Sequence, residues 1–349
     1  MTLPSSLPTP KLPDAYGTTP LRWGVVGPGG IAHSFVASVL KYTGQRFTAV
    51  ASSDIDRARA FAEQYGIPTA YGSYEDLFAA PDVDAVYVAT RQEGHLEPVL
   101  GAIRAGKHVL VEKPIAMLPH EVETIMAAAS AAGVLVMEAM WTTYLPQSYV
   151  IRQLLADGVL GSIRLIQADL GQDLRHVERL VDPNGGGAAL DVGIYPIAFS
   201  AQFFDHAPVA IHASGSLTTT GVDAESVIRL DYGNDSRAIA YSSILSFSTT
   251  TAWVDGEHAS IALGRPFFTP TSVTLFSREF NPTPVAHWDD NNGIRGHEGL
   301  CYQATAFASY VEQGLTASPF RPLEASLRDI QTITEARHQF GAIYPVERA

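Results

Sequence analysis

The chain is poor in cysteine, with Cys301 the single one among its 349 residues. One thiol excludes an internal disulfide framework and a cysteine-based zinc site. No catalytic partner is evident in the sequence around Cys301, so a small packed residue is the favoured interpretation and a nucleophile the alternative. Because a single cysteine allows no internal disulfide, we expect the protein to be in the reducing cytoplasm.

Long apolar runs and clusters of positive charge are also missing. No run approaches the roughly 20 apolar residues that a membrane-spanning helix needs. The net charge of −13 at pH 7 repels phosphate polymers. We therefore expect a protein that binds neither a membrane nor nucleic acid. The composition, 46% hydrophobic and 17% charged, is typical of a globular chain, and the length allows two domains.

The order of the chain predicts an α/β protein with a flexible proline-rich arm and two domains. Residues 1–20 carry five prolines and lack the apolar core of a signal peptide. Residues 21–140 alternate apolar strand patterns, such as 85–89 and 108–111, with helical ones, such as 119–132. This alternation predicts a doubly wound parallel Rossmann sheet covered on both faces.

Residues 141–349 follow a different pattern. Strand-like segments between 163 and 276 are separated by short turns with glycine or asparagine, and helical patterns close the chain at 302–313 and 323–340. This pattern predicts an α/β domain with a mostly antiparallel sheet.

A glycine-rich turn follows the first predicted strand and precedes the first predicted helix. Its sequence, Gly-Pro-Gly-Gly-Ile-Ala, matches G-x-G-x-x-A. Such a turn lets the backbone approach a pyrophosphate, which then rests on the helix N-terminus. The motif predicts an NAD or NADP site whose contacts include Gly27, Gly29, Gly30, Ile31 and Ala32.

The residue that contacts the adenosine ribose should close the second strand. Ser52 and Ser53 stand there, and their neutral side chains tolerate a 2′-phosphate, with Arg57 one helical turn away. Asp54 and Asp56 oppose a phosphate. The balance favours NADP over NAD.

Lys113 directly follows a predicted strand, at the edge where parallel strands place their ligands. An ammonium group there can donate a hydrogen bond to a substrate oxygen, and a lowered pKa would suit it to proton relay. Glu112 precedes it and Pro114 makes the segment rigid. The alternative is an exposed lysine paired with a carboxylate.

Taken together, these motifs resemble a known family. The chain is similar, from Leu21 onward, to the glucose–fructose oxidoreductase / inositol dehydrogenase / rhizopine catabolism (Gfo/Idh/MocA) oxidoreductases, and within them to the dimeric dihydrodiol dehydrogenase and NADP-dependent D-xylose dehydrogenase branch. The similarity is carried by the segments 27–32, 90–95, 105–109, 112–114, 138–142 and 185–196.

The resemblance implies roles for individual residues. It makes Lys113 and Tyr195 the proton-handling pair, with Asp191 orienting the reacting group and Trp141 walling the substrate site. It adds cofactor contacts from Thr90, His95, Glu112 and Lys113, and Arg91, which stands where the family has proline, is a further candidate contact. The resemblance also implies that residues 141–349 form a substrate-binding and dimerisation domain, whose large open sheet forms a homodimer or a dimer of dimers.

Three departures from the family pattern stand out. Thr90-Arg91-Gln92 replaces the usual Thr-Pro-Asn or Thr-Pro-His, Ser52-Ser53 replaces a Ser-Arg pair, and the segment from Trp141 to Tyr144 lacks the branch's arginine. The substrate can therefore differ from those of the named enzymes.

The residues themselves suit an alcohol oxidation. A tyrosine, with an ordinary pKa of about 10, is a poor base at neutral pH, and a nearby lysine cation lowers that value. Asp191 shares a helix face with Tyr195 if this segment is helical, and a helix N-cap is its alternative role. Arg175 and His176, on a polar loop, are candidate contacts for substrate hydroxyls, and solvated loop charges are the alternative.

No metal is expected, because the histidines do not fall into clusters at ligand spacing. We expect His287, His297 and His338 to be structural or surface residues. The preferred function is NAD(P)-dependent hydride transfer to or from a sugar, polyol or cyclic diol. The alternatives are a glycoside hydrolase or lyase that uses NAD for transient oxidation, and a non-catalytic dinucleotide sensor.

Overall fold

The structure, a computed structural model, describes residues 2–348, which form two compact units. The Rossmann unit comprises residues 12–144 and 295–327. The sheet unit comprises residues 2–11, 145–294 and 328–348. Residues 295–327, placed by the sequence in the second domain, therefore belong to the Rossmann unit.

Six parallel strands form the sheet of the Rossmann unit, in the order β3-β2-β1-β4-β5-β6. The predicted α/β fold class is confirmed in this half of the chain. Strand order reverses between β1 and β4, and ligands bind outside the carboxyl ends of strands at such a point. The strands are β1 (Arg22–Val26), β2 (Arg46–Ala51), β3 (Thr69–Tyr71), β4 (Ala85–Val88), β5 (His108–Val111) and β6 (Val136–Glu138).

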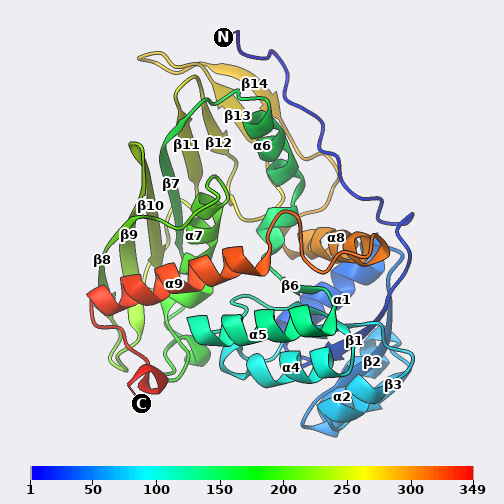
Figure 1. Ribbon diagram of the computed structural model, residues 1–349. Helices are drawn as coiled ribbons and strands as arrows, with labels where there is room; N and C mark the ends of the chain where they lie inside the picture. Colours follow the sequence, from blue (N-terminus) through cyan, green and yellow to red (C-terminus); the bar gives the residue numbers. More distant parts are fainter. Residues whose placement is uncertain (1, 349) are drawn as a thin grey trace. The chain divides into compact units, whose positions relative to one another are not determined.

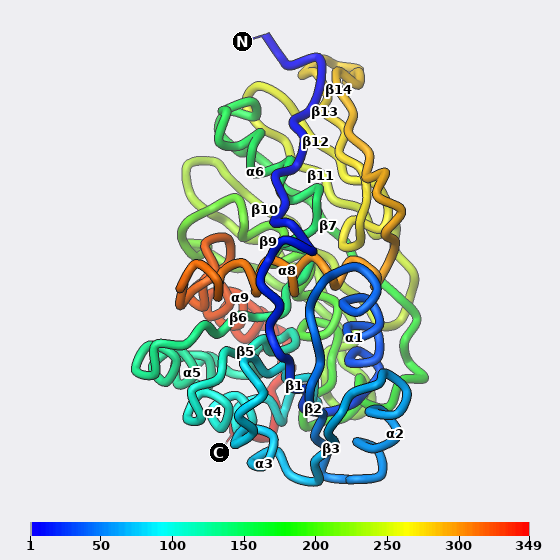
Figure 2. Tube along the Cα trace, turned by 90° about the vertical axis from the view of Figure 1, so that its right-hand side faces the viewer, coloured from blue at the N-terminus to red at the C-terminus, as the bar shows by residue number. Residues whose placement is uncertain are grey.

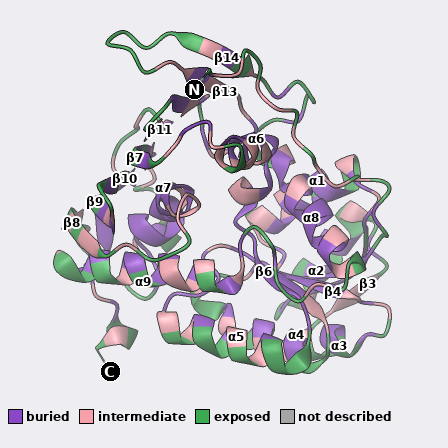
Figure 3. Cartoon of the chain, turned by 45° about the horizontal axis from the view of Figure 1, so that its top comes forward, coloured by how far each residue is buried: buried purple, intermediate pink, exposed green. Residues whose placement is uncertain are grey.

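Helices cover both faces of this sheet (Figure 2). On α5 the buried residues Val122, Ile125 and Ala129 recur every three or four positions, which gives the helix one apolar side. Its other side faces solvent (Figure 3). The helices are α1 (Gly30–Tyr42), α2 (Ile55–Tyr65), α3 (Tyr74–Ala79), α4 (Leu96–Arg104) and α5 (Pro119–Ala132).

The segment 295–327 joins this unit because its apolar side completes the core beside β1. It contains a 3₁₀ turn, Gly296–Gly299, and α8 (Leu300–Glu312). The ring of Phe307 on α8 lies 5.0 Å from that of Trp23, which is fully buried. Cys301 is also buried, and burial raises the pKa of its thiol to about 12, so a packed residue is its role.

An eight-stranded sheet in the order β14-β13-β12-β11-β7-β10-β9-β8 forms the second unit. Its neighbours pair antiparallel except β7 with β10, as expected for a mostly antiparallel sheet. The strands are β7 (Ile163–Gly171), β8 (Ala210–Leu217), β9 (Asp223–Gly233), β10 (Ser236–Ser243), β11 (Ala252–Gly256), β12 (Ser260–Leu263), β13 (Val273–Phe276) and β14 (Pro284–Trp288).

One face of this sheet is covered and the other is open. Along β9, Ile228 and Leu230 are buried, whereas Val227 and Arg229 between and before them are exposed. The covering helix α7 (Ile194–Ala201) packs on β7 and β10, as Figure 1 shows. The unit also contains α6 (Pro146–Ala156) and most of α9 (Leu323–Gln339).

Residues 2–20 contain no helix or strand. Within the Rossmann unit, the arm turns at Asp14, and the backbone amide of Gly44 donates to Ala15 at 3.0 Å. Among the described residues, none of the helices combines the length and the apolar character needed to cross a membrane.

Candidate functional site

The glycine turn lies between β1 and α1 and leaves the start of that helix open. Gly27 has φ of +84°, and a Cβ atom there would lie 2.9 Å from the backbone nitrogen of Thr90, so only glycine fits. A Cβ on Gly30 would meet nothing within 4 Å. Gly29 caps the helix without a side-chain hydrogen bond. The first-turn amides of α1 can therefore donate hydrogen bonds to a pyrophosphate.

The second strand ends in a tightly bonded turn. Ser52 is buried, and its Oγ accepts from the amide of Asp54 at 3.2 Å. The Asp54 carboxylate in turn caps α2 by accepting from Asp56 at 3.0 Å and from Arg57. Asp54 is thus engaged with the backbone, while the side chains of Ser53 and Arg57 are exposed.

His95 connects the loops that follow β4 and β5. It is buried, with Nδ1 2.9 Å from the carbonyl of Pro114 and Nε2 3.1 Å from that of Thr90. Burial lowers the pKa of this imidazole, and the two carbonyls oppose the shift. His95 therefore links these two loops through its ring nitrogens. Arg91 is exposed and pairs with Glu93 at 2.7 Å.

Glu112 and Lys113 stand at the carboxyl end of β5. Glu112 is buried, and the Tyr87 hydroxyl donates to its Oε1 at 2.5 Å. Burial raises the pKa of Glu112 to about 7, against the Tyr87 hydrogen bond and the Lys113 charge. Lys113 is half-buried, and its backbone amide donates to Glu112 Oε2 at 3.2 Å. The predicted strand-end lysine thus has a buried carboxylate beside it.

Trp141 and His297 form a further part of this edge. Trp141 begins a 3₁₀ turn after β6 and is almost fully buried, with 2% of its surface exposed. The ring of His297 lies 5.8 Å from the Trp141 ring, at 56° to it. Desolvation and the charge of Lys113 both lower the pKa of His297. In the sequence analysis His297 was expected to be a structural or surface residue.

In the sheet unit, Asp191 and Tyr195 lie on one continuous helical segment. Ala189–Gly193 is a π-helical turn that leads into α7. Asp191 is buried inside this turn, and its oxygens accept from Arg179 at 3.0 and 3.3 Å. The N-cap interpretation of Asp191 is therefore wrong, since Gly193 precedes α7. The Tyr195 ring is half-buried and lies 5.2 Å from that of Phe268.

The polar loop before this segment is solvated. Arg175 and His176 are both exposed. Arg175 pairs with Asp173 at 2.7 Å, and this ion pair lowers the pKa of Asp173 to about 2. A substrate that contacts Arg175 would have to share it with that carboxylate.

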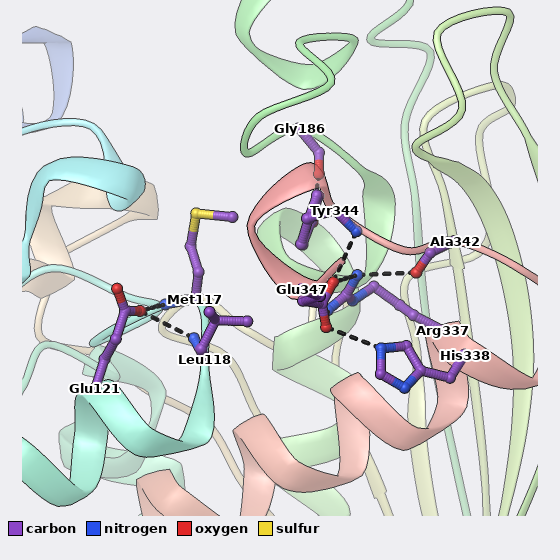
Figure 4. Close-up of polar contacts among 9 residues, drawn as sticks. All are labelled: Met117, Leu118, Glu121, Gly186, Arg337, His338, Ala342, Tyr344 and Glu347. Atoms are coloured by element: carbon purple, nitrogen blue, oxygen red, sulfur yellow. Dashed lines mark hydrogen bonds and ion pairs between the residues drawn. The ribbon is translucent and has the colours of Figure 1, made fainter. Parts of the chain in front are cut away.

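A buried network holds the glycine-rich loop that precedes Asp191 (Figure 4). The Tyr344 hydroxyl donates to the carbonyl of Gly186 at 2.6 Å. Asp223 accepts from the amide of Ala189 at 2.6 Å, and a Cβ on Gly187 would lie 2.2 Å from Asp223 Oδ1. Glycine at 187 is therefore required by this carboxylate.

Arg337 anchors the same network. It is fully buried, pairs with Glu347 at 3.0 Å and lies 4.0 Å above the Tyr344 ring. The sequence did not single out Asp223, Arg337 or Tyr344, because they are distant from the motif in the chain. Among the described residues, no group of three or more His, Cys, Asp or Glu is suited to hold a metal ion.

Comparison with known proteins gives family matches over most of the chain. A model described as an oxidoreductase family with an NAD-binding Rossmann fold matches residues 21–140, and a GFO/IDH/MocA C-terminal domain model matches 150–262. The trans-1,2-dihydrobenzene-1,2-diol dehydrogenase of Mus musculus is 35% identical over 332 residues, which cover 94% of this chain and 99% of that protein. The Homo sapiens protein of that name is 35% identical over 336 residues, with the same coverage.

Solved structures agree. A 3-ketoreductase from Actinomadura kijaniata in complex with NADP and TDP-benzene has a TM-score of 0.77 at 27% identity, covering 93% of this chain and 99% of that one. An aldose–aldose oxidoreductase from Caulobacter crescentus shares the fold, with a TM-score of 0.81 at 22% identity and coverage of 92% and 97%.

Proposed function

Because this chain belongs to the Gfo/Idh/MocA family of NAD(P)-binding oxidoreductases, we propose that it transfers a hydride between nicotinamide and a secondary hydroxyl or carbonyl of a carbohydrate or cyclic diol. The observation that carries the proposal is the edge of the Rossmann sheet. There the helix start behind Gly30 is uncapped, and Lys113 follows β5 at the same carboxyl edge. Relatives named trans-1,2-dihydrobenzene-1,2-diol dehydrogenase and 3-ketoreductase support a hydroxyl or carbonyl as the reacting group.

When bound, the nicotinamide supplies the two-electron chemistry by accepting or giving the hydride. The protein must handle the proton. On oxidation the substrate carbon loses a hydride and its oxygen loses a proton, which leaves a carbonyl. We assign that proton to Lys113 and Tyr195, since an ammonium favours the phenolate and brings a phenol pKa toward the working range. Arg179 fixes the carboxylate of Asp191, the proposed orienting group.

Initial rates test this function. Purified protein, mixed with NADP or NAD and a panel of sugars, polyols and cyclic diols, should change absorbance at 340 nm with some member of the panel. No turnover with any member, despite measured cofactor binding, would contradict the proposal. Product formed without net reduction of cofactor would identify the hydrolase or lyase alternative. Binding without any product would identify the sensor.

NADP is the proposed cofactor, because Ser52 and Ser53 bear no charge at the end of β2 and Asp54 is bonded to the α2 backbone. Ser52→Asp should shift the ratio of kcat/KM toward NAD by about 10-fold or more, since a carboxylate accepts from ribose hydroxyls and repels a 2′-phosphate. Ser73→Asp, on the capping residue of α3, is the matched control. An unchanged preference for NADP in Ser52→Asp would show that this strand end does not contact the ribose.

A homodimer or dimer of dimers through the open face of the eight-stranded sheet is also part of the proposal. That face carries apolar side chains in addition to charges: Val227 is 45% exposed, and the rings of Trp253 and Phe276 lie 5.0 Å apart and half-exposed. Burial of such a surface favours association. Sedimentation that returned only the 37.5 kDa species would contradict it. The cytoplasmic location expected from the sequence belongs to the same proposal, and cell fractionation checks it.

A further inference from the structure

We propose that His297 recognises the hydroxyl group adjacent to the one that reacts, and so selects vicinal diols, whether carbohydrates or cyclic diols. The inference rests on the proposed function and deepens it, because it assigns substrate specificity to a residue outside the family motifs. It is built on the placement of His297 beside Trp141 and Lys113 within the Rossmann unit.

The backbone that carries His297 is firmly held. His297 lies in the 3₁₀ turn Gly296–Gly299. The next residue, Glu298, accepts from Lys41 on α1 at 2.6 Å through its side chain, and from Ser38 at 2.5 Å through its carbonyl. Ser38 also accepts from the amide of Cys301 at 2.9 Å. These bonds hold the backbone of the turn against α1, so the position from which the His297 side chain projects is set before any substrate binds.

The ring nitrogens of His297 are available to form hydrogen bonds with a ligand. The side chain is exposed, and in the part of the chain that the structure describes neither ring nitrogen takes part in a hydrogen bond. Its neighbours are the Trp141 ring at 5.8 Å and the charge of Lys113. His297 thus lies beside an aromatic ring and within reach of the charge of the proposed proton-handling lysine.

The chemistry of this pair fits a diol. Desolvation and the Lys113 charge lower the pKa of His297, which keeps the imidazole neutral near pH 7. A neutral imidazole has one donor and one acceptor, as a hydroxyl group does. The indole of Trp141 offers an apolar surface for the carbon side of the same ring. With Lys113 assigned to the reacting oxygen, we assign the hydroxyl on the neighbouring carbon to His297.

Two variants and a pair of probes test the inference. His297→Phe keeps a ring against Trp141 and removes both polar atoms, whereas His297→Gln restores a donor and an acceptor without a titrating group. With trans-cyclohexane-1,2-diol or D-xylose as substrate, His297→Phe should lower kcat/KM by about 10-fold, chiefly through KM, with the KM for NADP unchanged. His297→Gln should recover most of this loss. His287→Phe, at an exposed histidine bonded to Thr274 at 2.9 Å, is the control and should behave as wild type.

Cyclohexanol, which lacks the second hydroxyl, separates recognition from a general defect. If the inference holds, wild type and His297→Phe turn it over at equal rates, because the lost contact does not exist. Equal loss on diol and alcohol, no loss on the diol, or a raised KM for NADP would each overturn it.

Absence of turnover in wild type would refute the proposed function without deciding this inference. Equilibrium titration of trans-cyclohexane-1,2-diol into the NADP complex then decides it. An affinity for the diol that is weakened in His297→Phe and retained in His297→Gln would support the inference. An affinity that is unchanged in both variants would contradict it.

Discussion

Lys113→Ala and Tyr195→Phe are each expected to lower kcat by about 100-fold or more, with the affinity for NADP little changed. Lys113→Ala removes the charge that favours the phenolate, and Tyr195→Phe removes the proton itself. Neither side chain lies on the glycine turn, so the pyrophosphate contacts should survive. Stopped-flow or steady-state rates, with cofactor affinity from fluorescence titration, measure both effects.

Controls separate chemistry from folding. Lys11→Ala and Tyr241→Phe change the same residue types outside the proposed site, at an exposed arm residue and on β10. Both should retain wild-type rates. If Lys113→Ala and Tyr195→Phe both kept near-wild-type turnover, neither residue would belong to the catalytic machinery.

Arg321→Met should lower the free energy of unfolding by about 3–5 kcal/mol, the cost of leaving one member of a buried ion pair without its partner. In the Rossmann unit, Arg321 donates to Oε2 of Glu138 at 2.9 and 2.5 Å, and Ser326 donates to the same oxygen at 2.7 Å. The two side chains are only 5% and 0% exposed. Glu138 at the end of β6 also accepts from the amide of Ile115 at 3.0 Å through Oε1, so both of its carboxylate oxygens have hydrogen-bond donors.

Arg22→Met is the matched control. Arg22 pairs with Asp84 at 2.7 Å, but these side chains are 46% and 32% exposed, and such surface pairs contribute about 0–1 kcal/mol. Urea unfolding followed by circular dichroism compares the two variants. Equal stability losses in Arg22→Met and Arg321→Met would show that Glu138 is solvated, contrary to the structure.

Five of the six strands of the Rossmann sheet could be predicted, because these strands are short runs of apolar residues. β5 and α5 were predicted at their observed bounds, and in α5 the buried residues Val122, Ile125 and Ala129 recur every three or four positions. β3, α3, α6 and β14 were missed, and three of them for an evident physical reason. β3 has three half-buried residues, β14 is an edge strand that begins with proline, and α6 opens with the buried polar residues Gln147 and Ser148.

The residues of the candidate site also differ in whether the sequence could predict them. Motifs of adjacent residues, the glycine turn and Glu112-Lys113, were found from the sequence because each chemical unit is local. The roles of His297, Asp223 and Tyr344 were not predicted, because the residues that they contact are distant from them in the sequence. The assignment of Lys113 with Tyr195 remains a prediction, since the two residues belong to different units.

By itself, the sequence determined the type of each layer and the glycine turn that we propose holds the cofactor, since hydrophobic period and glycine spacing act over a few residues. Tertiary structure alone decided that residues 295–327 pack beside β1 through Phe307 and Trp23, and that an imidazole thereby stands next to Trp141. Contacts between residues more than a hundred positions apart leave no local pattern, because burial depends on what the whole chain encloses.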